Sequence, residues 1–233
     1  MYTGETITRE ELCRTFDHSN LKAYADEAAF RKLCDEAKEN HCAMVAINSG
    51  PTALCHKLLE GTDIHVGAAI SFPLGQTTIE EKVHETQEAI KNGADEIDYV
   101  LNVGEVKNGN YNYIRKEMEA IVGVCRSAGV ISKVIFEICY LTEEEIIQIA
   151  KIAKEVKPDF VKTSTGFGPG GATVEAVKLM KQTVGDEIKV KAAGGIRSWA
   201  DCKMMLDAGA ERIGTSSTLK ILEEFDAERK KEN

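Results

Sequence analysis

Short apolar stretches alternate with longer segments of helical periodicity along nearly the whole chain. The predicted strands are residues 15–22, 42–48, 65–71, 96–102, 133–139, 159–164, 188–192 and 211–214. The predicted helices that follow them are residues 26–39, 52–60, 78–91, 111–128, 143–156, 174–184, 198–208 and 217–230. Strands joined through helices form a parallel sheet with right-handed crossovers. Eight such units in 233 residues predict an α/β fold, a closed (β/α)8 TIM barrel more than an open doubly wound sheet.

The barrel pattern runs without a linker or a change of composition, so residues 1–233 are predicted to form a single domain. Residues 1–14 precede the first strand and are expected to be a short helical extension, with the helix at 8–14. Residues 226–233 contain the only run of charges and are expected to be a frayed, solvated tail.

The balance of charges excludes some functions. The chain has 29 Lys and Arg against 38 Asp and Glu, a formal net charge of −9, which argues against binding of nucleic acid. No apolar run approaches the roughly 20 residues that span a membrane, and the first residues lack the pattern of a secretory signal. The seven cysteines include no C-x-x-C pair and are expected to be reduced thiols. We therefore expect a cytoplasmic protein with no membrane partner.

Two predicted strands carry a lysine close to their C-terminal ends, Lys162 and Lys191. Side chains on a strand alternate between two faces, and the outer face of a barrel strand packs under helices, where a charge is costly. The lysines are therefore expected to point into the barrel, and the same reasoning places Asp98, Lys133 and Glu137 there. Active sites of such barrels lie at the C-terminal ends of the strands, near both lysines.

A structural network of salt bridges is the simpler explanation of these buried charges. Two arguments count against it: buried ion pairs stabilise less than apolar packing, and two neighbouring lysines repel each other. A second cation also lowers the pKa of a lysine, which makes its amine nucleophilic at neutral pH. A neutral lysine attacks a carbonyl to form a Schiff base, and the iminium then accepts electrons from the adjacent carbon–carbon bond. The charges therefore indicate Schiff-base chemistry.

Two segments resemble the signature strands of the deoxyribose-phosphate aldolase family, residues 161–167 (VKTSTGF) and 190–197 (VKAAGGIR). Further similar blocks are residues 17–19 (DHS), 72–75 (FPLG), 95–98 (DEID), 133–137 (KVIFE) and 214–217 (GTSS). The blocks occur in order and reach across nearly the whole chain. The resemblance implies a metal-independent class I aldolase with a (β/α)8 barrel and no cofactor.

The resemblance also implies a role for each charged residue. Lys162 is expected to form the Schiff base, Lys191 to tune its pKa and exchange protons, and Asp98 to assist proton transfer. Lys133, Glu137 and Asp17 are expected to surround these three. The implied reaction is the reversible cleavage of 2-deoxy-D-ribose 5-phosphate to D-glyceraldehyde 3-phosphate and acetaldehyde. Relatives of this kind are usually homodimers.

A phosphate needs backbone N–H donors and the start of a helix, and glycine lets the backbone approach it. Three glycine-containing turns meet this need, at residues 166–168, 194–195 and 214–217. Together with the resemblance, they predict contacts to substrate or phosphate from Gly166, Gly195, Ser216, Ser217 and Ser19. Arg197 either joins this site or is a solvated residue at a helix start. His18 is expected to be a structural histidine beside the pocket.

Some features limit these predictions. The five histidines form no metal-binding pattern, so no metal is expected. Ala46 stands where many family members have a cysteine, and the chain ends without the tyrosine that relays protons in some members. Two other functions stay open: another Schiff-base barrel aldolase, such as a transaldolase-like enzyme, and a non-catalytic barrel that binds phosphorylated metabolites.

Overall fold

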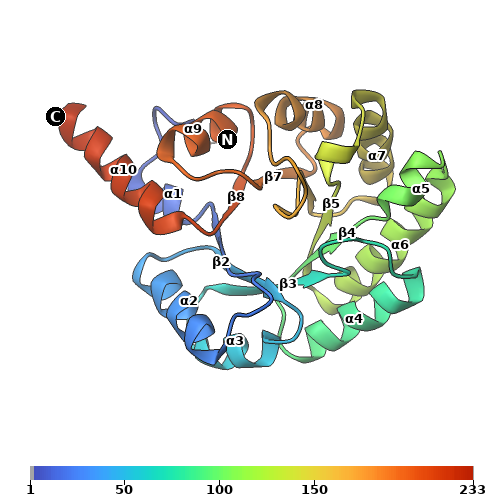
Figure 1. Ribbon diagram of the computed structural model, residues 1–233, viewed down its shortest axis with the longest axis horizontal. Coiled ribbons are helices and arrows are strands. Elements are labelled where there is room, and N and C mark those ends of the chain that lie inside the picture. The colour runs from blue at the N-terminus through green and yellow to red at the C-terminus, as the bar shows by residue number, and fades with distance from the viewer. Residues whose placement is uncertain (1–2, 233) are drawn as a thin grey trace.

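The computed structural model describes residues 3–232, and its eight parallel strands close into a barrel in the order of the sequence (Figure 1). The predicted TIM barrel is therefore confirmed. The strands are β1 (Phe16–Ser19), β2 (Met44–Asn48), β3 (His65–Ile70), β4 (Glu96–Val100), β5 (Ile131–Ile135), β6 (Phe160–Lys162), β7 (Lys189–Ala193) and β8 (Arg212–Thr215).

The helices surround the barrel (Figure 1). They are α1 (Arg9–Cys13), α2 (Glu27–Glu39), α3 (Thr52–Leu58), α4 (Ile79–Lys91), α5 (Val103–Lys107), α6 (Tyr111–Ala128), α7 (Glu143–Val156), α8 (Val174–Val184), α9 (Trp199–Asp207) and α10 (Thr218–Glu232). A 3-10 turn, η1 (Ile138–Tyr140), follows β5. The short elements α5 and η1 were not predicted, because five and three residues are too few to show a period.

Side-chain caps fix where several helices begin. Thr78, Thr142 and Ser198 each accept a hydrogen bond from the backbone N–H three residues later, which satisfies a donor that the helix leaves free. At Thr142 the capping box is complete, because Glu145 accepts a hydrogen bond from the backbone N–H of Thr142. These local signals explain why the predicted start of each of these helices lies within one residue of the observed one.

The predicted strand at 133–139 is too long. Strand β5 ends at Ile135, and Glu137 then adopts left-handed backbone angles, with φ 57° and ψ 61°. A residue in this conformation cannot continue a strand, so the alternation of faces stops before Glu137. Strand β4 similarly ends at Val100, and Asn102 caps the short helix α5. Both corrections matter because they change which side chains reach the barrel interior.

The expected frayed tail is wrong for residues 226–232, which belong to α10. Helix α10 packs against α1, and Arg9 Nε lies 3.1 Å from a carboxylate oxygen of Asp226. The guanidinium of Arg229 also donates to the carbonyl oxygens of Gly4 and Glu5, at 2.9 and 2.8 Å. These contacts with the N-terminal segment hold the end of the helix in place. Residues 1, 2 and 233 lie outside the described residues.

Side chains along each strand point alternately toward the surrounding helices and toward the barrel axis. Val134, Val161, Val190 and Ile213 belong to the apolar core between strands and helices. Their sequence neighbours Lys133, Lys162, Lys191 and Arg212 therefore face the barrel axis, as the period of two requires.

All seven cysteines are free. Among residues 3–232 no helix is long and apolar enough to span a membrane.

Candidate active site

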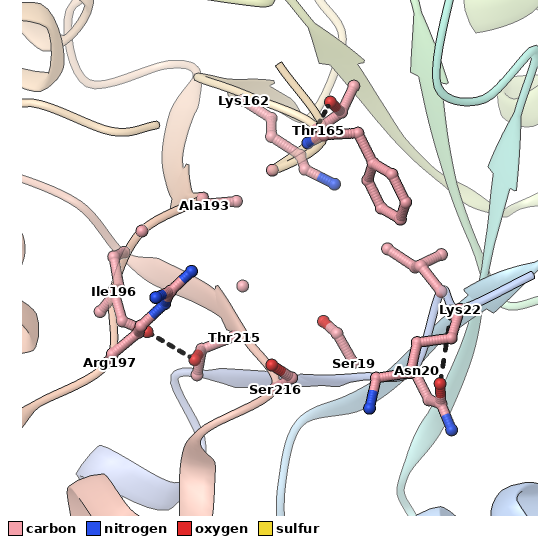
Figure 2. A pocket seen from close by; sticks show the side chains of 16 residues that line it. Ser19, Asn20, Lys22, Lys162, Thr165, Ala193, Ile196, Arg197, Thr215 and Ser216 are labelled. Carbon is pink, nitrogen blue, oxygen red and sulfur yellow. Dashed lines mark hydrogen bonds between the residues drawn. The ribbon is translucent and has the colours of Figure 1, made fainter. Parts of the chain in front are cut away.

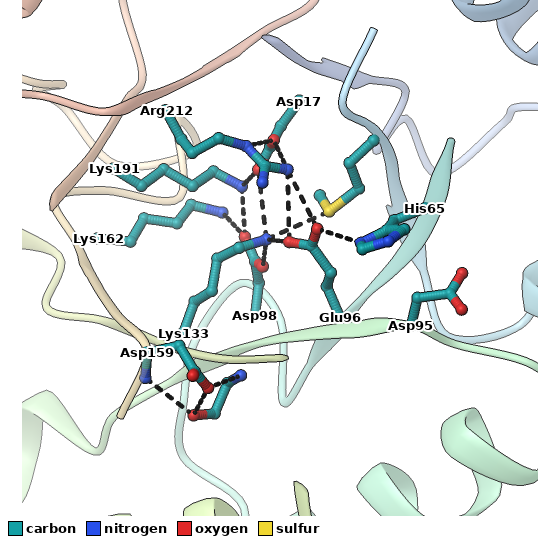
Figure 3. Close-up of polar contacts among 12 residues, drawn as sticks. Asp17, His65, Asp95, Glu96, Asp98, Lys133, Asp159, Lys162, Lys191 and Arg212 are labelled. Carbon is teal, nitrogen blue, oxygen red and sulfur yellow. Dashed lines mark hydrogen bonds and ion pairs between the residues drawn. The ribbon is translucent and has the colours of Figure 1, made fainter. Parts of the chain in front are cut away.

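The carboxylate of Asp98 is the centre of a charged cluster inside the barrel (Figure 3). Its Oδ2 atom accepts hydrogen bonds from Lys162 Nζ at 2.8 Å and from Lys191 Nζ at 2.6 Å. Its Oδ1 atom accepts one from Lys133 Nζ at 2.9 Å. The register of the sheet brings these groups together, because Asp98 pairs with Lys133 and Lys162 pairs with Lys191. Four of the five side chains that the sequence placed in one interior do meet there.

Three further residues complete the cluster: Asp17 in β1, and Glu96 and Arg212, which are the first residues of β4 and β8. Asp17 pairs with Lys191 and Lys133 and accepts from Arg212 Nε at 2.6 Å. Glu96 pairs with Lys133 and with Arg212 at 3.2 Å, and His65 Nδ1 lies 2.8 Å from it. Asp17 was predicted near the site, whereas the network role of Glu96 and Arg212 was missed. Parity alone points to both, because Glu96 shares its face with Asp98 and Arg212 shares its face with Gly214.

The cluster separates the pKa values of its members. Burial lowers the pKa of Lys162 from its ordinary 10.5 to about 8, while Asp98 opposes this shift and Lys191 adds to it. Burial raises the pKa of Asp98, but the three lysines outweigh burial and hold that pKa well below its ordinary value. Burial acts to lower the pKa of Lys133, but Asp17, Asp98 and Glu96 raise it above the usual range. Lys162 is thus the lysine prepared to lose its proton, with burial as the larger cause and the second cation as a smaller one.

A count of charges leads to the same residue. Lys133, Lys162, Lys191 and Arg212 are four cations that face three carboxylates, from Asp17, Glu96 and Asp98. Loss of one proton balances the cluster in a region where an uncompensated charge is expensive. Lys162 has a single carboxylate partner recorded among residues 3–232, so loss of its proton breaks fewer ion pairs than loss of a proton from any other cation of the cluster.

A pocket of about 240 Å³ opens next to Lys162, at the C-terminal ends of the strands. Figure 2 shows Lys162 and Thr165 on one side and Ser19, Thr215, Ser216 and Arg197 across from them. The predicted contact residues Ser19, Gly166, Gly195 and Ser216 all line this pocket, and so does Arg197. Ser217 lines a neighbouring pocket instead, and its backbone N–H donates to Thr215 Oγ1 at 2.9 Å. The backbone N–H of Ser217 is therefore already used within the protein.

Glycine is required at two places beside the lysines. A Cβ atom on Gly214 would lie 3.1 Å from Lys191 Cε and 2.9 Å from Ala193 Cβ, so glycine leaves room for the lysine side chain. Gly195 has φ +81°, a conformation that other residues rarely adopt, at the turn between β7 and α9. This turn lines the pocket with backbone, which suits an anion that binds to N–H groups.

Glu137 does not join the lysine cluster, contrary to expectation. Its carboxylate accepts hydrogen bonds from the backbone N–H of Thr165 at 3.2 Å and from the Thr165 hydroxyl. The reason is the left-handed turn after Ile135, which takes Glu137 off the inward face of β5. Glu137 therefore supports the loop after Lys162 and not the amine itself.

The remaining polar candidates have simpler roles. His18 is buried, with Nδ1 2.9 Å from Thr218 Oγ1 and Nε2 2.9 Å from Glu36 Oε2, so both ring nitrogens have structural partners. Among residues 3–232, no group of three or more His, Cys, Asp or Glu side chains is placed to hold a metal ion. The three carboxylates of the cluster are instead held by lysine and arginine.

The sequence of this barrel matches the model of a known family. Residues 13–224 match the family model described as DeoC/LacD family aldolase. The chain belongs to this aldolase family. It is 59% identical over 214 residues to the deoxyribose-phosphate aldolase of Lactobacillus acidophilus, across 92% of this chain and 90% of the relative. It is 50% identical over 219 residues to the deoxyribose-phosphate aldolase of Bacteroides thetaiotaomicron, across 94% and 92%.

A solved structure supports the same assignment. The deoxyribose phosphate aldolase from Aeropyrum pernix, whose structure is described as tetrameric, is similar to this aldolase with a TM-score of 0.88 and 30% sequence identity. The similarity covers 94% of this chain and 93% of that one. The family assignment makes this protein a lyase, in agreement with the resemblance noted in the sequence.

Proposed function

We propose that this aldolase reversibly cleaves 2-deoxy-D-ribose 5-phosphate to D-glyceraldehyde 3-phosphate and acetaldehyde through a Schiff base on Lys162. The substrate is supported by the relatives, which are deoxyribose-phosphate aldolases at up to 59% identity. The observation that carries the mechanism is a buried lysine at the pocket whose pKa is lowered to about 8. The relatives do not favour a transaldolase-like enzyme or a non-catalytic barrel.

In the direction of cleavage, the neutral amine of Lys162 attacks the C1 carbonyl of the open-chain sugar. Loss of water gives an iminium, and a base removes the proton of the C3 hydroxyl. The C2–C3 bond then breaks, its electrons move to the iminium, and D-glyceraldehyde 3-phosphate leaves. The resulting enamine is protonated at C2, and water releases acetaldehyde and restores Lys162. Each of these proton transfers needs a group close to the amine.

Asp98 and Lys191 are the groups available for these transfers. Asp98 Oδ2 lies within 2.8 Å of both amines, so it can exchange protons with Lys162 directly or through a water. Lys191 keeps a positive charge beside the reacting nitrogen, which favours the neutral form of Lys162. This pair is held in place by the ion pairs among the surrounding residues Lys133, Asp17, Glu96 and Arg212.

The pH dependence of cleavage tests the role of Lys162. With a pKa near 8 the amine is about 10% neutral at pH 7, about 300-fold more than at the ordinary 10.5. We expect kcat/KM to rise with pH and level off above about 8. In Lys191→Met the rise should move to higher pH, because the variant lacks the cation that lowers this pKa. An unmoved profile in that variant would contradict the tuning role.

The phosphate is proposed to bind among Ser19, Gly195, Ser216 and Arg197, opposite Lys162 in the pocket (Figure 2). Ser216→Asp places a negative charge there, so kcat/KM for the phosphorylated sugar should fall by about 100-fold through repulsion. Cleavage of unphosphorylated 2-deoxyribose should change little in the same variant. Equal losses for both sugars would show that Ser216 does not face the phosphate. Ser127→Asp, on the outside of α6, is the matched control.

We also infer a homo-oligomer in the cytoplasm. The Aeropyrum pernix relative is described as a tetramer, and the family resemblance favours a dimer. The free cysteines are consistent with a reducing compartment. Light scattering of the purified protein measures the assembly directly, and a monomeric mass would reject this inference.

A further inference from the structure

A second pocket of about 450 Å³ lies beside the Lys162 pocket, over the ends of β3 to β6. Thr165 and Phe167 line both pockets. The apolar side chains of the second pocket, here called the side pocket, are Pro73, Leu74, Val100, Val103, Tyr140 and Phe167. The serine-bearing turn after β8 lines the Lys162 pocket but not the side pocket, so the proposed phosphate site and the side pocket are separate.

The charged groups around the side pocket are already engaged. Lys107 Nζ pairs with Glu145 at 2.6 Å, and the Glu137 carboxylate accepts both hydrogen bonds of Thr165. Gln76 contributes a neutral amide. With its lysine paired, the side pocket offers little to an anion, and its exposed apolar surface favours a hydrocarbon group.

Phe167 is the wall between the two pockets. Its side chain is 55% exposed although it is large and apolar, and its ring meets Phe72 edge to face, with centroids 5.3 Å apart. Gly166, with φ +85°, and Gly168 flank it in the loop after Lys162. A half-exposed ring between two glycines is not held by the core, so other contacts must fix its position.

A short chain of hydrogen bonds supplies that support. The backbone N–H of Phe167 donates to Thr165 Oγ1 at 3.0 Å, and the Thr165 hydroxyl donates to Glu137. The second oxygen of Glu137 accepts from the Thr165 backbone N–H at 3.2 Å. Glu137 is buried in a left-handed conformation, which is costly for this residue type. The carboxylate of Glu137 thus fixes the position of Thr165, and Thr165 in turn holds the backbone N–H of Phe167.

We propose that Phe167 is a specificity-determining wall that closes off the side pocket, a latent subsite for the hydrocarbon chain of an unphosphorylated aldehyde acceptor. This inference rests on the proposed aldolase function. The step itself is the same aldol addition: the enamine carbon on Lys162 bonds to the acceptor carbonyl carbon, whose oxygen takes a proton. Water then hydrolyses the iminium and frees the product. With the wall in place, the acceptor chain is confined to the phosphate side of the pocket.

The test compares acetaldehyde addition to hexanal with acetaldehyde addition to D-glyceraldehyde 3-phosphate. Phe167→Ala joins the two pockets, so the ratio of kcat/KM for hexanal to that for the phosphorylated acceptor should rise at least about tenfold, through a lower KM for hexanal. Adding Val103→Phe fills the side pocket from α5 and should cancel the gain. Val103→Phe alone and Leu219→Ala, across the mouth of the barrel, are the controls.

Thr165 provides an independent check on the support of the wall. Thr165→Val removes the hydroxyl that links Phe167 to Glu137, so it should shift the ratio in the same direction by a smaller factor. Thr165→Ser keeps the hydroxyl and should restore the parent ratio. If Thr165→Val and Thr165→Ser both have the parent ratio, the hydrogen bonds do not hold the wall.

The outcomes separate the two proposals. If the parent protein does not use D-glyceraldehyde 3-phosphate, the proposed function fails. If it does, but Phe167→Ala leaves the ratio unchanged, or the gain survives Val103→Phe, the wall and subsite are wrong. Thermal unfolding of each variant shows that it is folded, and the ratio of two substrates in one preparation is independent of the active fraction.

Discussion

Replacing Lys162 with alanine is expected to lower kcat/KM for cleavage of deoxyribose 5-phosphate by about four orders of magnitude. No other amine in the cluster can take over the reaction. Lys133 and Lys191 are each held by more than one carboxylate, and both side chains are fully buried. Lys162 combines a lowered pKa with a place in the lining of the pocket.

Borohydride trapping measures this directly. Reduction in the presence of acetaldehyde should add one ethyl group to the parent protein, and digestion should locate it at Lys162. Lys162→Ala should remain unlabelled, whereas Lys189→Ala, which changes an exposed lysine at the other end of β7, should behave as the parent does. A labelled amine elsewhere, or full activity in Lys162→Ala, would overturn the assignment.

Asp98→Asn is expected to reduce turnover by about 10²- to 10⁴-fold while the Schiff base still forms. Asp98 raises the pKa of Lys162, so the variant amine should be neutral at a lower pH than in the parent. The loss of activity therefore cannot come from protonation of the nucleophile. It comes from the missing carboxylate between the two amines, which accepts and returns protons. Borohydride trapping should persist, and the rise of trapping with pH should move to lower pH.

The same variant should also be less stable, by about 3–5 kcal/mol, because three buried lysines lose a shared partner. Glu96→Gln is the matched control. Glu96 is equally buried and contacts Lys133 and Arg212, but no ion pair between it and Lys162 is recorded among residues 3–232. It should lose comparable stability with a much smaller fall in turnover. Equal falls in turnover would mean that Asp98 acts only through the fold.

Local patterns in the sequence were sufficient for the barrel and for most of the charged cluster. The alternation of strands and helices, with glycines where α6 and α8 end, places α6, α7 and α8 at their predicted bounds. Alternation within strands places Asp98, Lys133, Lys162 and Lys191 on the side of the barrel axis, because the other face of each strand packs under helices, where a charge is costly. Glu96 and Arg212 follow from the same rule: Glu96 shares a face with Asp98 but was not predicted as a member of the cluster, and parity was not applied to the strand of Arg212.

The predictions failed where the chain leaves regular structure. Glu137 was placed by parity, but a left-handed turn after Ile135 turns its carboxylate to Thr165. The contact of Ser217 with substrate stays a prediction, although only its neighbour Ser216 lines the pocket of Lys162. No pattern in the sequence reports the backbone angles of such turns. The contacts of the tail with Arg9 and Gly4 are equally invisible, because the two ends of the chain meet only after folding.

The sequence by itself therefore determined which residues face the barrel interior, since that depends on a local period of two. Tertiary structure decided which of these residues touch, and so which lysine has a lowered pKa. The low pKa of Lys162 arises from its burial and from the nearby Lys191, and a single carboxylate opposes this shift, while Lys133 in the same interior is surrounded by three acids and stays charged. That difference depends on the register between strands and on distances of a few ångströms, which the closure of the barrel sets.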